Sequence, residues 1–166
     1  MTEACQCSPD AGSEPSEIHV QSLGRNVCPT NGRQGKLVDT KTVMAMLMIP
    51  LTHVKPAQYY FCREADCPTV YYSTDGQIFN ETYLRERVFQ KNPNDGSVHV
   101  CYCFRHSANS IHEELESTGK LTVIESITNG IQAGQCACEV RNPQGTCCLG
   151  NVIKLLKKLQ IEQQHI

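Results

Sequence analysis

The sequence predicts an α+β protein, with a small part made of a zinc knuckle and a β-hairpin followed by a helical part that ends in a C-terminal helix. Two short segments rich in β-branched and aromatic residues, 58–62 and 69–73, precede an Asp75-Gly76 pair, which is a strong signal for a hairpin turn. Beyond residue 104 the apolar residues recur at helical spacing. The sequence therefore predicts three segments: a tail over 1–22, a β-rich zinc-binding subdomain over 23–100 and a helical subdomain over 101–166.

In the β-rich part, Asp39 or Thr40 is positioned to cap a helix over 42–48 that ends before Pro50. Residues 77–79 follow the hairpin turn as a strand. Further strands are predicted over 85–90 and 98–104.

Three helices are predicted in the second part. The first begins after the N-cap Ser107, covers 111–116 and ends at Gly119. The second covers 121–133 and ends at Gly134. The last begins near Gly150 and carries an apolar stripe.

Composition limits the function classes. The chain has 166 residues and a net charge of −2, which excludes a broad basic surface for nucleic acid. The first twenty residues hold no apolar run, so no signal peptide is predicted. The longest apolar stretch, 43–49, is far short of the about 20 residues that a membrane span needs. We therefore expect a cytoplasmic protein without a membrane span.

Cysteine is the unusual residue, with 11 in the chain. In the cytosol, structural disulfides are rare and cysteine clusters usually bind metal or take part in redox chemistry. The odd number also argues against a closed disulfide framework.

The first cysteine group is Cys28, Cys62 and Cys67. Cys28-Pro29 opens a glycine-rich turn typical of a metal knuckle, and the other two lie five apart between two predicted strands. Three thiolates that converge favour structural Zn²⁺, which takes four tetrahedral ligands. Possible fourth ligands are Cys5, Cys7 and His53. The alternative is that Cys62 and Cys67 are only small buried residues.

The second group has six thiols, in Cys101-Tyr102-Cys103, Cys136-Ala137-Cys138 and Cys147-Cys148. The two thiols of a Cys-x-Cys pair can bind the same metal centre if the chain kinks there, because the kink turns both side chains to one side. Two thiols from the first pair and two from the 136–148 loop would satisfy a [2Fe–2S] cluster, which needs four. A second zinc site with unused cysteines is the alternative that spacing leaves open.

No enzyme site is predicted, although an enzymatic role stays open. Nucleophilic catalysis would need an activated cysteine beside a histidine. Cys103 and His106 lie three residues apart, but Cys103 belongs to the second metal group.

At these residues the sequence resembles a known family. The runs 100–104 and 136–150, with the knuckle at Cys28-Pro29 and the segment 61–72, closely resemble the N-terminal domain of CopZ-type copper chaperones, which are iron–sulfur-binding metallochaperones. The resemblance covers about 26–158. Residues 101–138 are also weakly similar to the [2Fe–2S] module of bacterioferritin-associated ferredoxins.

The resemblance implies a [2Fe–2S] cluster on Cys101, Cys103, Cys138 and Cys148, with Cys136 and Cys147 unused. It implies zinc on Cys28, Cys62 and Cys67. Asn31 stands where the family usually has a fourth cysteine, so the zinc site either takes Cys5 or Cys7 or is open and weaker.

This sequence contains no Cys-x-x-Cys, whereas full-length members carry such a loop in a heavy-metal-associated domain. The resemblance therefore does not carry over copper transfer by that loop. The expected function is a metal-binding, metallochaperone-like redox protein that supports copper handling by one-electron transfer.

The expected partners are a copper chaperone or copper-transport ATPase and an unidentified electron donor. Because soft thiolates prefer Cu(I), Cys5 and Cys7 could capture that ion. Two alternatives remain: a ferredoxin-like carrier or cluster sensor without copper, and a zinc-stabilised interaction module.

Overall fold

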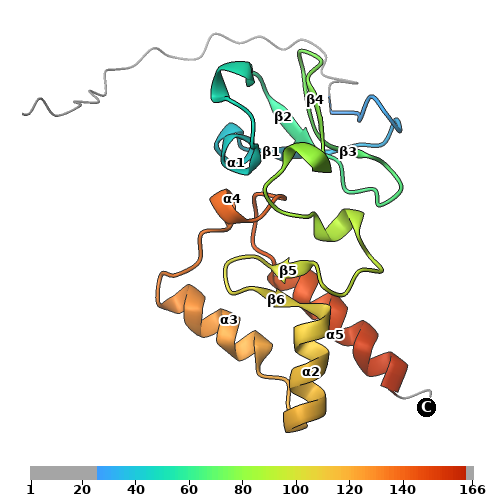
Figure 1. Cartoon of the computed structure of the whole chain (residues 1–166), viewed down its shortest axis with the longest axis vertical. Coiled ribbons are helices and arrows are strands. Elements are labelled where there is room, and N and C mark those ends of the chain that lie inside the picture. The colour runs from blue at the N-terminus through green and yellow to red at the C-terminus, as the bar shows by residue number, and fades with distance from the viewer. Residues whose placement is uncertain (1–25, 164–166) are drawn as a thin grey trace, which may run out of the picture.

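The computed structural model describes residues 26–163. Figure 1 shows an upper half built around a small sheet and a lower half built from helices around a two-stranded ribbon. The expected α+β class is confirmed. No helix among the described residues is both long and apolar enough to cross a membrane.

The upper half is an antiparallel sheet whose four strands are neighbours in the order in which they occur along the chain. The strands are β1 (Lys36–Val38), β2 (Tyr59–Phe61), β3 (Thr69–Ser73) and β4 (Ile78–Asn80). β2 and β3 pair so that Tyr60 faces Tyr72. The predicted turn joins β3 to β4, and Gly76 takes the left-handed conformation (φ 92°) that a residue without Cβ adopts without steric cost.

Helix α1 (Thr40–Met46) covers the sheet. The Asp39 side chain accepts a hydrogen bond from the Lys41 amide, which caps the helix as the sequence predicted. Val43 and Met46 of α1 share one buried core with Tyr59, Phe61 and other residues of the sheet. Three short 3₁₀ helices complete this half: η1 (Leu51–His53), η2 (Glu81–Tyr83) and η3 (Phe89–Lys91).

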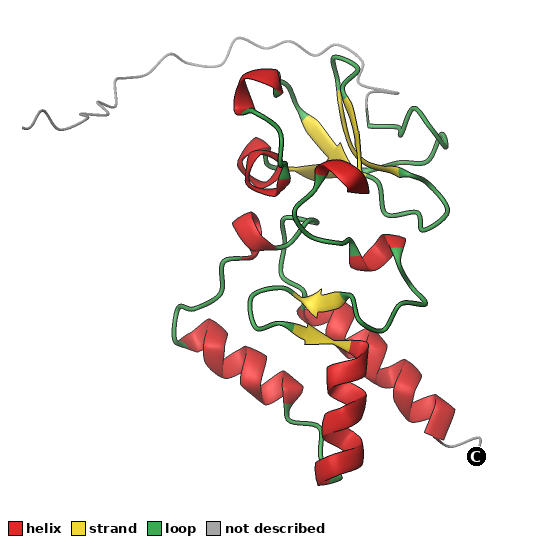
Figure 2. Cartoon of the chain, in the orientation of Figure 1, coloured by secondary structure: helices red, strands yellow, loops and turns green. Residues whose placement is uncertain are grey.

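The lower half (Figure 2) holds the ribbon and most of the helix. Its elements are β5 (His99–Cys101), β6 (His106–Ser107), α2 (Ala108–Thr118), α3 (Val123–Gln132), α4 (Cys138–Arg141) and α5 (Leu149–Gln163). Ser107 and Ser110 form a reciprocal capping box at the start of α2. Gly119 ends α2 in the left-handed conformation. A second buried core joins the ribbon to α2, α3 and α5 through Val100, Ile111, Ile127 and Val152.

Hydrogen bonds tie the two halves together. The buried Tyr71 hydroxyl of β3 donates to the Pro143 carbonyl, in the loop after α4. Thr42 of α1 donates to the Glu139 carbonyl of α4, at 2.6 Å. The segment 138–143 is therefore held by hydrogen bonds from the upper half as well as by packing of Cys138 in the second core.

One predicted strand is wrong. Residues 85–88 form no regular strand, and 89–91 form η3. The Arg85 amide bonds to the Met46 carbonyl at the end of α1, and the Val88 amide bonds to the Glu81 side chain. These tertiary partners take the place of a neighbouring strand. The strand predicted over 98–104 is also shorter, because the chain turns at 102–105.

Candidate metal centres

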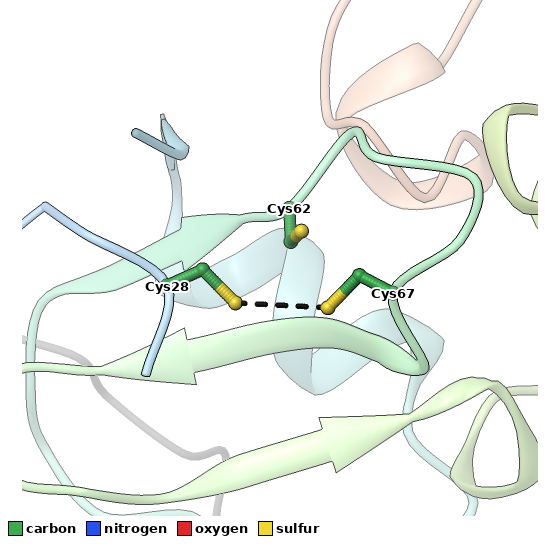
Figure 3. A group of neighbouring side chains, drawn as sticks. All are labelled: Cys28, Cys62 and Cys67. Atoms are coloured by element: carbon green, nitrogen blue, oxygen red, sulfur yellow. Dashed lines mark hydrogen bonds between the residues drawn. The ribbon is translucent and has the colours of Figure 1, made fainter. Parts of the chain in front are cut away.

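The first centre lies where a tight turn meets the ends of β2 and β3. The chain reverses at 28–33 through hydrogen bonds between Cys28 and both Gly32 and Arg33. Cys62 follows β2 directly, and Cys67 precedes β3. Figure 3 shows the three side chains pointing toward one another.

These three thiols are buried and close. Their sulfurs all lie within 4.8 Å of one another, and the Cys28 and Cys67 sulfurs are 3.8 Å apart. Tetrahedral Zn²⁺ with Zn–S bonds of about 2.3 Å separates its sulfurs by about 3.8 Å. The donor set therefore fits one zinc ion with three of its four ligands.

Local hydrogen bonds favour the thiolate at Cys28. Burial disfavours its charged form, but the backbone amides of Asn31 and Thr30 and the two neighbouring thiols outweigh burial and lower the pKa of Cys28. Burial raises the pKa of Cys67. A metal cation at this position would offset that cost.

The fourth zinc ligand is not supplied by a clustered cysteine or histidine among residues 26–163. Asn31, in the knuckle, donates from Nδ2 to the Cys62 sulfur at 3.5 Å. His53 lies exposed on η1 and is not part of the thiol group. Cys5 and Cys7 lie outside the described residues.

The second centre draws on three separate places in the sequence. Cys101 ends β5, Cys103 lies in the following turn, Cys136 and Cys138 flank the start of α4, and Cys148 lies just before α5. Left-handed backbone at Arg105 (φ 60°) helps the chain reverse there and return as β6. This turn supplies the kink that the Cys-x-Cys spacing required.

Distances define one side of this centre. The sulfur of Cys103 is 3.7 Å from that of Cys138 and 3.9 Å from that of Cys136, and the last two are 3.5 Å apart. The Ala137 amide donates to the Cys103 sulfur at 3.3 Å. Backbone donors of this kind stabilise sulfur-bound negative charge.

The other side is reached through Cys148. Cys148 is buried in the second core together with Cys101 and Cys138. Donation from Cys148 lowers the pKa of Cys138 to about 5 and that of Cys101 to about 7, while the pKa of Cys148 itself is raised. Burial raises the pKa of Cys103 to about 12. Cys138 is therefore a thiolate at neutral pH, which is the form that binds a metal cation.

The structure distinguishes the two cysteines of the doublet. Cys148 is buried in the second core, whereas Cys147 is exposed.

The structure also places the Cys136 thiol in this group, although the family resemblance left Cys136 unused. The repeated Cys-x-Cys spacing at 101/103 and 136/138 was a signal for its presence, but spacing cannot tell which thiols converge. Five thiols are more than the four that a [2Fe–2S] cluster needs, so the donor set fits such a group.

Comparison with known proteins gives three findings. Residues 25–85 match the family of CopZ zinc-binding domains. The copper chaperone CopZ of Archaeoglobus fulgidus is 31% identical over 121 residues, or 73% of this chain. The crystal structure of the N-terminal domain of that protein superposes with a TM-score of 0.63 at 32% identity, covering 78% of this chain and 96% of that domain.

The chain belongs to the family of the CopZ N-terminal domain. The family match covers the knuckle and the sheet, and therefore contains Cys28, Cys62 and Cys67. The superposition extends beyond it into the helical half, since it covers 78% of the chain. The chain spans 57% of the length of Archaeoglobus CopZ.

Proposed function

We propose that this CopZ-type chain is a metal-binding redox protein that supports copper handling. Cys28, Cys62 and Cys67 hold a structural zinc ion in this proposal. Cys101, Cys103, Cys138 and Cys148 hold a [2Fe–2S] cluster. The observation that carries the proposal is the convergence of thiols from three separate chain segments, 101–103, 136–138 and Cys148, in the second core.

In this proposal the two groups of thiolates hold different parts of the fold together. The zinc-bound thiolates fix the knuckle against the ends of β2 and β3. The four cluster-binding thiolates bring the two Cys-x-Cys segments to the start of α5, and the Ala137 amide offsets negative charge on the Cys103 sulfur. When bound, the cluster supplies one-electron chemistry.

The proposed reaction is the transfer of one electron to Cu(II), which becomes Cu(I), the form that soft thiolates prefer. The electron enters from a one-electron donor protein such as a reduced flavoprotein. The relative's name, a copper chaperone, supports copper as the substrate and a copper chaperone or copper-transport ATPase as the recipient.

A second function is a ferredoxin-like electron carrier without copper. It rests on the second centre alone, because a [2Fe–2S] cluster on Cys101, Cys103, Cys138 and Cys148 would pass single electrons to an acceptor other than copper. The two functions share both metal centres and differ only in the electron acceptor.

Mixing experiments distinguish them. The full chain, reduced anaerobically with dithionite and freed of excess reductant, is mixed with equimolar Cu(II) and a colorimetric Cu(I) chelator. Copper handling predicts Cu(I) formation together with return of the oxidised visible spectrum. The matched control is Cys101→Ala, which should keep zinc and lose this reaction. If the reduced protein forms no Cu(I), the electron-carrier function is favoured instead.

A further inference from the structure

The second centre contains one thiol more than its proposed cluster uses, and that thiol is Cys136. A [2Fe–2S] cluster binds four thiolates, whereas five cysteines gather here. Cys136 is half-buried, and its sulfur contacts those of two proposed ligands, Cys103 and Cys138.

The spacing of the trio makes its members interchangeable. The sulfur pairs lie at 3.5, 3.7 and 3.9 Å. Sulfurs around one tetrahedral metal atom, with bonds of about 2.3 Å, lie about 3.8 Å apart. Any two of Cys103, Cys136 and Cys138 are therefore spaced to bind the same metal atom.

The backbone around Cys136 is suited to a small movement. Cys136 follows the left-handed Gly134 that ends α3 and lies outside any helix, whereas Cys138 is the first residue of α4. Cys136 and Cys138 are separated only by Ala137, whose amide is anchored on the Cys103 sulfur. A rotation about this anchor would bring the Cys136 thiol to the position of the Cys138 thiol.

The other proposed ligands have no such substitute among the described thiols. Cys101 is fully buried and shares the second core with Cys148, which is itself a proposed ligand. Cys147, beside Cys148, is exposed and is not part of the clustered thiols.

We propose that Cys136 is an alternate ligand of this centre, able to replace Cys138 beside Cys103. This inference rests on the proposed cluster. In the exchange, the bond from iron to the Cys138 sulfur breaks and a bond to the Cys136 sulfur forms. The proton leaves the Cys136 thiol and is taken up by the released Cys138 thiolate, and no electron is gained or lost.

Single and double substitutions in the full chain test the exchange. Cys138→Ala, Cys136→Ala, the double variant and the control Cys101→Ala are purified anaerobically and analysed for iron, acid-labile sulfide and zinc. Zinc content and the far-ultraviolet circular dichroism spectrum report folding. Cys138→Ala should keep its iron and sulfide with an altered paramagnetic resonance spectrum, while the double variant and Cys101→Ala should lose both.

Alkylation with iodoacetamide followed by mass spectrometry shows which thiol is bound. Cys136 should be labelled in wild type and protected in Cys138→Ala. Cys138→Val carries the same expectation and serves if Cys138→Ala does not fold. The exchange is refuted if folded Cys138→Ala or Cys138→Val loses iron as completely as the double variant, or if Cys101→Ala keeps its iron equally well.

Failure of the underlying proposal looks different. A wild-type protein that takes up neither iron nor sulfide on anaerobic reconstitution would overturn both the cluster and the exchange. A wild-type protein that binds the cluster, with a folded Cys138→Ala variant that does not, would overturn the exchange alone.

Discussion

Tyr71→Phe tests whether the sheet supports the loop that leads to Cys148. The Tyr71 side chain is fully buried and its hydroxyl donates to the Pro143 carbonyl, which is also buried. Burial raises the pKa of Tyr71 well above its usual value, so the hydroxyl remains a donor at all ordinary pH values.

The expected cost follows from the carbonyl that is left behind. Removing the hydroxyl leaves a buried acceptor without its partner, which costs about 1–3 kcal/mol. For a chain of this length, about 2 kcal/mol corresponds to a Tm lowered by about 4–8 °C. Because the affected loop precedes Cys148, release of iron from the second centre should also accelerate.

The matched control is Tyr60→Phe. That hydroxyl donates to the side chain of Gln58, which is exposed, so its loss leaves an acceptor that water can reach. Both variants are compared with wild type at equal metal content by thermal unfolding followed by circular dichroism. A Tm for Tyr71→Phe that is no lower than that of Tyr60→Phe would refute the reasoning.

Three further substitutions test other parts of the molecule. Cys62→Ser should reduce zinc per chain and leave iron unchanged, because the two thiol groups are separate; parallel loss of both metals in elemental analysis would contradict this. Gly130→Ala should destabilise the chain by about 1–3 kcal/mol in urea unfolding, since the added Cβ would lie 2.2 Å from Cζ of Phe104; an unchanged midpoint would show that the ring moves aside freely. Burial lowers the pKa of His106 below 6.5, so the unfolded chain binds that proton more readily and stability should fall as the pH drops below about 6.5. His106→Gln should lose less stability than wild type between pH 7 and pH 5, and equal losses would exclude this histidine as a source.

Local signals in the sequence predicted much of the fold. Asp39, Ser107 and Gly119 act as the caps expected of them, because a cap depends on contacts within a few residues. The Asp75-Gly76 hairpin is confirmed for the same reason. The short strands β1 and β6 were not predicted, since two or three residues carry too little periodicity to identify a strand.

The strand predicted over 85–90 is wrong for a different reason. Val88 and Phe89 favour a strand, but the Arg85 amide bonds to the Met46 carbonyl, which lies far away in the sequence, and the Val88 amide bonds to the Glu81 side chain. Such pairing is a tertiary effect that overrides local propensity.

Spacing predicted which thiols lie near one another, but not which metals they bind. Cys28, Cys62 and Cys67 lie together, and Cys103, Cys136 and Cys138 lie together, because each group lies at strand ends and loops that the fold brings close. Spacing placed Cys136 and Cys147 in the second set alike, and did not reveal that Cys136 lies in contact with Cys138 whereas Cys147 is exposed. These outcomes depend on the turn at 102–105 and on the start of α4.

Metal analysis of the anaerobically purified full chain tests the central claim most directly. Iron, acid-labile sulfide and zinc are measured per chain, and the dithionite-reduced sample is analysed by electron paramagnetic resonance. The account predicts about two irons, about two sulfides and about one zinc, with the resonance of one reduced [2Fe–2S] cluster. A folded, colourless protein that holds zinc at both thiol groups and no iron would contradict it.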